Sequence, residues 1–445
     1  MNISTGQCRY ITFALSVVLA LSTFSTNIFG QTKTVAELNS EIDNYVNQRT
    51  KALVADGKRV DPSKREELAK EKKSLAAKYA EQAAARAELN GGDLYYLGLL
   101  YVAAEDDEKV LDAMNRYLAQ FPAETKGSMI QSARSYVVVY STRRKLYDQA
   151  QTAYDAWLKG SPLETKDRPV LEEILAVALF KDGQYDKAIG YAQEAFDLLK
   201  NVKATSLPEK RARERIYENL VEVLALSYKK NKNSDKSLEI LAEARAESFA
   251  IPSADLYRKV MDFVQGSGFS EKKLMQKVES YASADAAPDL KIEEWIGQEP
   301  VSFDKLRGKV VLIDFWATWC MPCISTFPRL RGWYKKFGGN DFMIVGVTKY
   351  YGQQDGKKMS KLEESEFLKE FRSKYKLPYG IAVLSDNNED SMKYGINAFP
   401  TTILLDRNGV VRYIGIGNGA EESENLENMI EKVLKEGGQL ADARK

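Results

Sequence analysis

The chain has 445 residues with nearly balanced charge, 64 Lys and Arg against 63 Asp and Glu, no histidine and three cysteines. A formal net charge of +1 gives no electrostatic reason to expect a nucleic-acid partner. The absence of histidine excludes Ser-His and Cys-His nucleophilic catalysis and any His-ligated metal site, while the length favours two or three domains.

The N-terminus predicts export from the cytoplasm. One positive charge precedes an apolar run at residues 11–24, and small polar residues follow. This arrangement is typical of a secretory signal peptide, here residues 1–30, whose apolar run is too short for a secure membrane span. The alternative is an uncleaved anchor that keeps the protein in contact with the membrane. Either way we expect a periplasmic or otherwise extracytoplasmic protein, and cleavage would remove Cys8 and leave Cys320 and Cys323.

Residues 31–282 predict an all-α region. They are rich in Ala, Leu, Glu, Lys and Tyr, poor in Pro and Gly, and have apolar residues at helical spacing. Small and aromatic residues recur in register, most clearly around Gly183, Tyr185 and Ala188. The pattern resembles degenerate tetratricopeptide repeats, and this resemblance implies a stacked array with a concave surface for a peptide or protein partner. The alternative is an irregular helical bundle in which these positions are simply core.

Residues 283–290 are small and without periodicity, which predicts a linker before a second domain at residues 291–445. In this domain short apolar runs alternate with helical stretches, which predicts parallel strands joined by helical crossovers and a closing Asn-Gly hairpin. The expected strands are 310–315, 342–347, 381–384, 402–406 and 410–415, and the expected helices are 324–337, 364–375 and 421–436. We therefore predict a multidomain chain, an all-α helical repeat domain followed by an α/β domain.

Two cysteines separated by Met321 and Pro322 directly follow a predicted buried strand and open a predicted helix. At a helix N-terminus the free N–H groups and the macrodipole lower the pKa of a thiol, which makes it a better nucleophile near neutral pH. We predict that Cys320 attacks a substrate disulfide and that Cys323 resolves the mixed disulfide. The alternatives are a structural disulfide, which would close a very small loop, and a zinc site, which lacks two further cysteine or histidine ligands.

The motifs resemble the TlpA-like branch of the thioredoxin superfamily. The resemblance rests on residues 308–323, on the following Phe327 and Pro328, and on a second motif at residues 397–402. It implies a thioredoxin fold for the C-terminal domain and disulfide exchange with protein thiols and disulfides. The redox group would be the Cys320–Cys323 disulfide itself, so we expect no metal or other cofactor. An unidentified donor would supply the electrons.

The same resemblance suggests the substrate-binding residues. It implies that Pro400 is a cis-proline facing the disulfide and that the backbone of Phe399 pairs with an extended substrate segment. The residues that flank the cysteines complete the expected binding surface, and they are Trp319, Met321 and Pro322.

The chain departs from the family pattern at Asp314 and Thr326. Membrane-side TlpA-like reductases commonly have Asn six residues before the first cysteine and Glu three residues after the second, where this chain has these two residues. A carboxyl group on a buried strand has a raised pKa and would accept the proton of Cys323 as that thiol attacks. We predict Asp314 as the general base, and the alternative is a purely structural aspartate.

The dipeptide between the cysteines favours a reductant. Oxidants of this superfamily tend to have a histidine there that stabilises the thiolate, and this chain has none. One alternative is a thioredoxin-fold peroxidase, whose Thr-x-x-Cys spacing is not met by Thr318-Trp319-Cys320. Another is a peptide-binding scaffold with an idle redox domain.

Overall fold

The computed structural model describes residues 33–54, 61–121, 125, 127–160, 167–200, 206–250, 252–270, 273–274, 287–339, 341–354, 356–385, 391 and 393–442. Its contacts divide the chain into two compact units, Met1–Tyr117 and Leu118–Lys445. The predicted signal peptide and residues 283–286 of the predicted linker lie outside the described residues. Within the described ranges, every helix is too short or too polar to span a bilayer.

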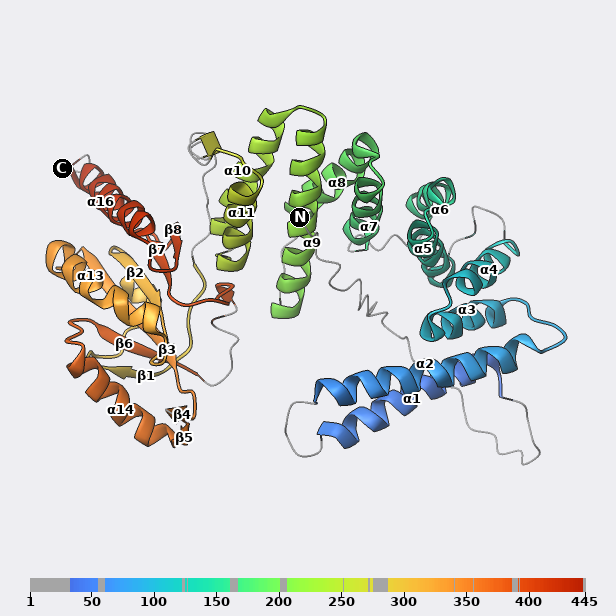
Figure 1. Cartoon of the computed structure of the whole chain (residues 1–445), viewed down its shortest axis with the longest axis horizontal. Helices are drawn as coiled ribbons and strands as arrows, with labels where there is room; N and C mark the ends of the chain where they lie inside the picture. Colours follow the sequence, from blue (N-terminus) through green and yellow to red (C-terminus); the bar gives the residue numbers. More distant parts are fainter. Residues whose placement is uncertain are drawn as a thin grey trace. The chain divides into compact units, whose positions relative to one another are not determined.

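The first unit is helical. Its helices, labelled in Figure 1, are α1 (Val35–Val54), α2 (Pro62–Ala84), α3 (Gly92–Ala104) and α4 (Asp107–Leu118), which ends at the unit boundary. Helix α3 meets the side chain of Met114, on α4, at Gly98, where a Cβ atom would lie 2.5 Å from the Cε atom of Met114. Because glycine has no side chain, Met114 packs directly against the backbone of α3.

The second unit begins with seven further helices among its described residues. They are α5 (Ser128–Arg143), α6 (Tyr147–Lys159), α7 (Arg168–Lys181), α8 (Tyr185–Lys200), α9 (Leu207–Lys230), α10 (Ser234–Ala250) and α11 (Ala254–Gly266). Neighbouring helices pack against each other, as in α5 with α6 and α7 with α8, and α5 also contacts α7.

The same turn joins the helix pairs α3/α4, α5/α6, α7/α8 and α9/α10. Its residue with positive φ is Glu105 (58°), Lys145 (59°), Gly183 (78°) or Lys232 (59°). In every case the next residue donates its N–H to a carbonyl near the end of the preceding helix, as the N–H of Gln184 does at 2.9 Å. This is the Schellman arrangement. Three of the four turns lack glycine, so the sequence signals this turn clearly only once. The recurrence supports a helical repeat, and the tetratricopeptide resemblance remains a prediction.

The C-terminal part forms a six-stranded sheet with the order β1-β6-β3-β2-β7-β8. Its strands are β1 (Ile292–Ile296), β2 (Val310–Phe315), β3 (Phe342–Lys349), β6 (Gly380–Leu384), β7 (Thr401–Leu405) and β8 (Val411–Ile416). Strands β2, β3 and β6 are parallel, and the other neighbours are antiparallel. The remaining elements are the 3-10 turn η1 (Phe303–Leu306), α13 (Met321–Phe337), the hairpin β4 (Gln353–Gln354) and β5 (Lys357–Lys358), α14 (Lys361–Lys374) and α16 (Ala420–Asp442).

This arrangement is a thioredoxin fold, and it confirms the predicted fold class of helices followed by an α/β domain. The five predicted strands and three predicted helices are all present, with bounds shifted by a few residues. The sequence did not predict β1, an edge strand with two glutamates, or the hairpin β4–β5, whose strands have two residues each. The predicted boundary at residues 283–290 remains a prediction.

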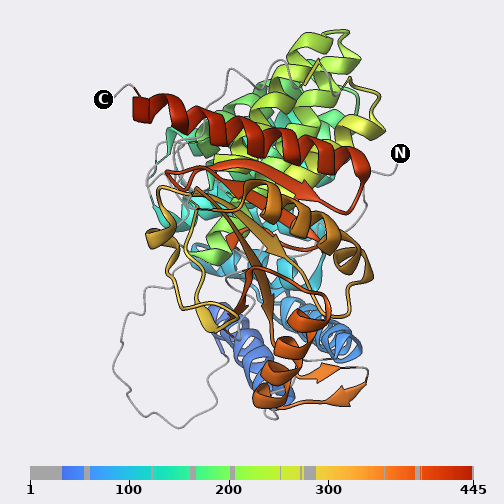
Figure 2. The same cartoon turned by 90° about the vertical axis from the view of Figure 1, so that its left-hand side faces the viewer.

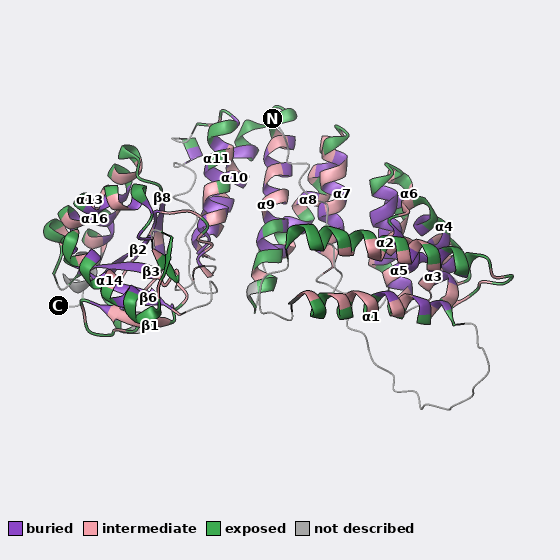
Figure 3. Ribbon diagram, turned by 60° about the horizontal axis from the view of Figure 1, so that its bottom comes forward, coloured by how far each residue is buried: buried purple, intermediate pink, exposed green. Residues whose placement is uncertain are grey.

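All six residues of strand β2 are buried (Figure 3). Since successive side chains of a strand point to opposite faces of the sheet, both faces are covered here. Leu312 and Trp316 belong to a core shared with α13, α14 and α16, and Figure 2 shows α13 and α16 in front of the sheet. Ile313 and Phe315 point the other way and share a core with residues of α7 to α11, including Val260. The final helices before the α/β domain therefore contribute the apolar layer on the second face of its sheet.

Candidate active site

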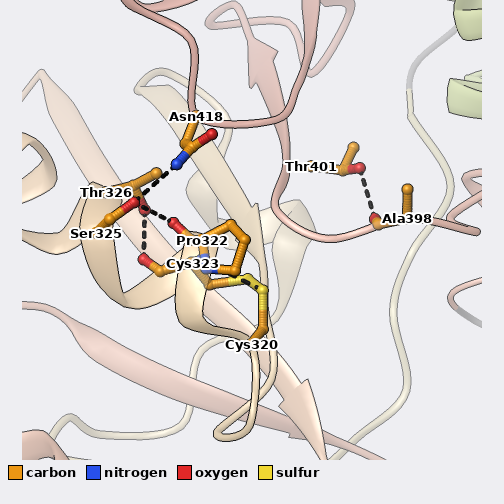
Figure 4. The surroundings of a disulfide bond; sticks show 8 residues. All are labelled: Cys320, Pro322, Cys323, Ser325, Thr326, Ala398, Thr401 and Asn418. Atoms are coloured by element: carbon orange, nitrogen blue, oxygen red, sulfur yellow. Dashed lines mark hydrogen bonds between the residues drawn. A yellow bond between two sulfur atoms is a disulfide. The ribbon is translucent and has the colours of Figure 1, made fainter.

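The cysteine pair lies at the start of α13, as Figure 4 shows. Cys320 is the N-cap residue of this helix, and its Sγ accepts a hydrogen bond from the N–H of Cys323 at 3.2 Å. Pro322 occupies the first turn, where a missing N–H leaves no helical hydrogen bond unmade. The two cysteines form a disulfide with their Cα atoms 5.3 Å apart. After reduction, the Cys320 sulfur would therefore lie where backbone N–H groups and the helix dipole stabilise a thiolate.

Exposure distinguishes the two cysteines and their neighbours. Cys320 is 5% exposed, whereas Cys323 is fully buried. On either side of Cys320, Trp319 is 58% and Met321 70% exposed, although both are large apolar side chains. Exposed apolar groups around a nearly buried sulfur provide a contact surface for another molecule. The gradient favours Cys320 as the sulfur that a substrate meets first.

The loop before β7 forms a second wall of the site. The peptide bond between Phe399 and Pro400 is cis, and the Phe399 ring lies edge-on to Trp319 with 6.0 Å between centroids. The hydroxyl of Thr401 donates to the carbonyl of Ala398 at 2.9 Å, as drawn in Figure 4. The structure thus brings together Trp319 and Phe399, two predicted binding residues that are far apart in the sequence.

The segment after β3 provides a third wall, and the sequence did not predict its Tyr351 as a site residue. The Tyr351 ring lies edge-on to Trp319 with 5.7 Å between centroids. The Glu364 carboxylate holds this segment by accepting the N–H groups of Tyr351 at 2.6 Å and Gly352 at 2.8 Å. In the neighbouring hairpin, Gln354 accepts a hydrogen bond from the Thr318 hydroxyl at 3.1 Å. No local sequence signal distinguishes Tyr351 from other loop tyrosines, because its role depends on a glutamate in the next helix.

A cavity of about 230 Å³ borders this aromatic cluster. Phe315, Val347 and Leu384 line its apolar side, and Lys349 and Asn397 contribute polar groups. The cavity lies beside the two walls formed by Tyr351 and Phe399. It offers space for a side chain beside Tyr351 and Phe399.

Asp314 lies in the middle of the sheet, paired in register with Gly346 of β3 and Thr402 of β7. It is fully buried, and neither carboxylate oxygen has a hydrogen-bond partner within the described part of the chain. Burial removes water from the carboxylate and raises the pKa of Asp314 from its usual 3.8 to about 7. Its side chain points to the same face as Leu312 and Trp316, which share their core with Cys320 and Cys323. Asp314 therefore has a pKa suited to proton transfer near neutral pH.

Thr326, the other departure from the family pattern, has a local role. Its hydroxyl donates to the carbonyl of Cys323 at 2.7 Å, and the Ser325 hydroxyl donates to the carbonyl of Pro322 at 2.6 Å. The side-chain amide of Asn418 donates in turn to the Ser325 hydroxyl at 2.9 Å (Figure 4). These contacts brace the first turn of α13. A hydroxyl engaged in this way is no substitute for a glutamate as a proton acceptor.

The fold and the oxidised cysteine pair place the C-terminal domain among proteins that exchange thiols and disulfides. In the described residues, no group of three or more His, Cys, Asp or Glu side chains is arranged to hold a metal ion.

Comparisons with known proteins agree with this class. The AhpC/TSA family model matches residues 284–414. The thiol-disulfide oxidoreductase ResA of Oceanobacillus iheyensis is 30% identical over 156 residues, which cover 34% of this chain and 73% of ResA. Protein DipZ of Mycobacterium tuberculosis is 33% identical over 143 residues, which cover 31% of this chain and 19% of DipZ. The crystal structure of a thiol-disulfide isomerase from Corynebacterium glutamicum is 24% identical, with 34% of this chain and 98% of that chain covered and a TM-score of 0.30.

Through its C-terminal domain the chain belongs to the ResA family of thiol-disulfide oxidoreductases, in the thioredoxin superfamily. The predicted resemblance to the TlpA-like branch and the predicted enzyme class are confirmed. The chain spans about a fifth of DipZ, so the wider activity of that protein does not transfer.

Proposed function

We propose that the protein is an extracytoplasmic reductase of protein disulfides. The observation that carries the direction is that no charged side chain in the dipeptide adds to the stabilisation that the start of α13 gives the Cys320 sulfur. Among the described residues its Sγ accepts one hydrogen bond, from the N–H of Cys323, and the side chains of Met321 and Pro322 offer no charge or hydrogen-bond donor. A thiolate without this additional stabilisation leaves the reduced form a better electron donor than in the strong oxidants. The extracytoplasmic location rests on the signal peptide predicted at residues 1–30.

The reaction begins with the reduced protein. The Cys320 thiolate attacks one sulfur of a substrate disulfide, the S–S bond breaks, and the other substrate sulfur leaves as a thiolate. The Cys323 thiol then transfers its proton to Asp314 and attacks the Sγ atom of Cys320, which releases the second substrate sulfur. Two electrons pass to the substrate, and the protein is left with the disulfide seen in the structure. An external dithiol must then reduce this disulfide.

Each wall of the site has a part in this scheme. The exposed Trp319 and Met321 contact the apolar parts of the substrate, and the backbone at Phe399 pairs with an extended segment that carries the substrate disulfide. The helical repeats recruit a substrate or the electron donor. This last role rests on the general use of helical arrays as binding surfaces.

The reduction potential of the Cys320–Cys323 pair tests the direction. We expect equilibration of the full chain in dithiol buffers to give a value near that of thioredoxin, about −270 mV. The full chain should also reduce insulin when a dithiol is supplied, and Cys320→Ser should not. A potential near that of DsbA, about −120 mV, would contradict the reductase assignment. An idle redox domain predicts no insulin reduction, and a peroxidase predicts peroxide consumption that depends on Cys320.

A further inference from the structure

The loop that leads into Phe399 and Pro400 rests on the helical part of the chain. The backbone N–H of Ala254, in the first turn of α11, donates to the carbonyl of Tyr394 at 2.9 Å. Tyr394 is fully buried, and its ring packs against Phe315 of β2 with 5.6 Å between centroids. Because the first N–H groups of a helix have no partner within that helix, the loop carbonyl completes the hydrogen bonding at the start of α11.

The next loop residue also lies close to the helix. Gly395 has φ +61°, and a Cβ atom there would lie 2.8 Å from the Oγ atom of Ser253 and 3.1 Å from the backbone N of Ala254. Ser253 is the N-cap of α11, and its Oγ accepts the N–H of Leu256 at 3.3 Å. A side chain at position 395 would therefore push the loop away from the helix.

Two polar contacts extend this attachment. The side-chain amide of Asn397 donates a hydrogen bond to the Oδ1 atom of Asp255. The ammonium group of Lys210, on α9, donates to the carbonyl of Lys393. Asp255 is in turn held by Arg258 at 2.8 Å and by Lys259 at 3.0 Å.

The Asp255 carboxylate is charged when it accepts the Asn397 amide. Partial burial alone would raise the pKa of Asp255, but the hydrogen bonds from Lys259 and Arg258 outweigh it and lower this pKa below its usual value. A hydrogen bond to a charged acceptor is stronger than one between neutral groups. The contact from Asn397 thus links the loop to a carboxylate that its neighbours hold in place.

We propose that Asp255 is a positioning residue for disulfide exchange, because its contact with Asn397 holds the loop that presents Phe399 and Pro400 to a protein substrate. Asn397 is two residues from Phe399, whose ring lies against Trp319 beside Cys320. The helical part of the chain then supports one wall of the active site directly. This inference rests on the proposed exchange with protein disulfides.

An exchange of the two side chains tests the proposal in the full-length protein. Asn397→Asp places two carboxylates against each other, and we expect kcat/KM for insulin to fall about 10-fold, mainly through KM. Adding Asp255→Asn restores an amide–carboxylate pair with reversed polarity, and the double variant should return to within about 3-fold of the wild type. Alkylation of reduced Cys320 by iodoacetamide should stay unchanged in all variants, because a small reagent needs no loop. A general folding defect would change alkylation and thermal stability as well.

Asp262→Asn, on the same helix and exposed, is the matched control and should behave as the wild type. The proposal is wrong if Asn397→Asp leaves insulin reduction unchanged, or if the double variant is as impaired as the single one. If circular dichroism shows that Asn397→Asp is unfolded, Asn397→Ser takes its place. We expect this variant to lower kcat/KM for insulin about 3-fold, and a normal rate would refute the proposal. Exchange is also followed in reverse, as oxidation of reduced ribonuclease A. If only the reverse reaction occurs, the reductase assignment fails while the variants still test the loop.

Discussion

The two main walls of the site are built in different ways. The wall that carries the cysteines is local: a buried strand ends, Cys320 caps the next helix, and Cys323 donates its N–H to the Cys320 sulfur within one turn. The wall that carries Pro400 depends on distant parts of the chain, since Asn397 contacts Asp255, 142 residues earlier. In this molecule a short motif therefore sets the chemistry of the sulfur atoms, and long-range packing sets the position of the loop whose Phe399 ring lies against Trp319.

Removing the attacking sulfur gives the largest expected effect on the local wall. We expect Cys320→Ser to abolish insulin reduction, a loss of at least about 1,000-fold, because Cys323, the other cysteine in the described part of the chain, is fully buried. Cys323→Ser should keep the first attack and accumulate mixed disulfides, visible on non-reducing gels. If Cys320→Ser formed the mixed disulfides instead, Cys323 would be the attacking cysteine and Cys320 the resolving one.

The burial of Asp314 predicts that the free energy of unfolding depends on pH. Its pKa is raised from 3.8 to about 7 in the folded protein, so the folded state binds more protons than the unfolded state between these values. The stability contributed by the protonated carboxyl is thus lost as pH rises, and Asp314→Asn should remove this loss. The free energy of unfolding of the variant, relative to that of the wild type, should therefore rise by about 4 kcal/mol between pH 4 and pH 8. Urea unfolding of the oxidised proteins at both pH values measures this gain, and a pH-independent difference would contradict the raised pKa.

The same substitution tests proton transfer. We expect Asp314→Asn to slow resolution of the mixed disulfide about 100-fold at pH 7, while the first attack by Cys320 changes little. Rapid-quench kinetics with a chromogenic disulfide separate the two steps. Asp341→Asn, an exposed aspartate just before β3, serves as the control. Equal resolution rates in the wild type and Asp314→Asn would leave Asp314 a structural residue.

The smallest expected effect concerns the loop before Pro400. Gly395→Ala should destabilise the protein by about 2 kcal/mol, because the new Cβ meets Ser253 Oγ at 2.8 Å in a left-handed backbone conformation. Gly268→Ala is the matched control, with φ +69° and nothing within 4 Å of its Cβ, and should cost about 1 kcal/mol. If the two variants lose the same stability in urea unfolding, the loop is not held tightly against α11.

Much of the fold could be predicted because its signals are local. The apolar runs of β2, β3 and β6 and the Asn-Gly turn between β7 and β8 are visible in short windows of sequence, and all are present. The edge strand β1 carries charged residues, and Glu364 anchors the segment that carries Tyr351 through two hydrogen bonds. Neither feature produces a recognisable pattern in a short window of sequence, so neither was predicted.

The sequence by itself determined the chemistry: a cysteine pair after a buried strand, an aspartate on that strand, and no histidine to stabilise a thiolate. Only the tertiary structure decided that Trp319 would lie between Tyr351 and Phe399, and that α11 would cover the sheet and hold Gly395 and Asn397. The physical reason is that a helix terminus and a strand form from neighbouring residues. The position of a loop depends on the shape and hydrogen-bonding groups of elements that are remote in the chain.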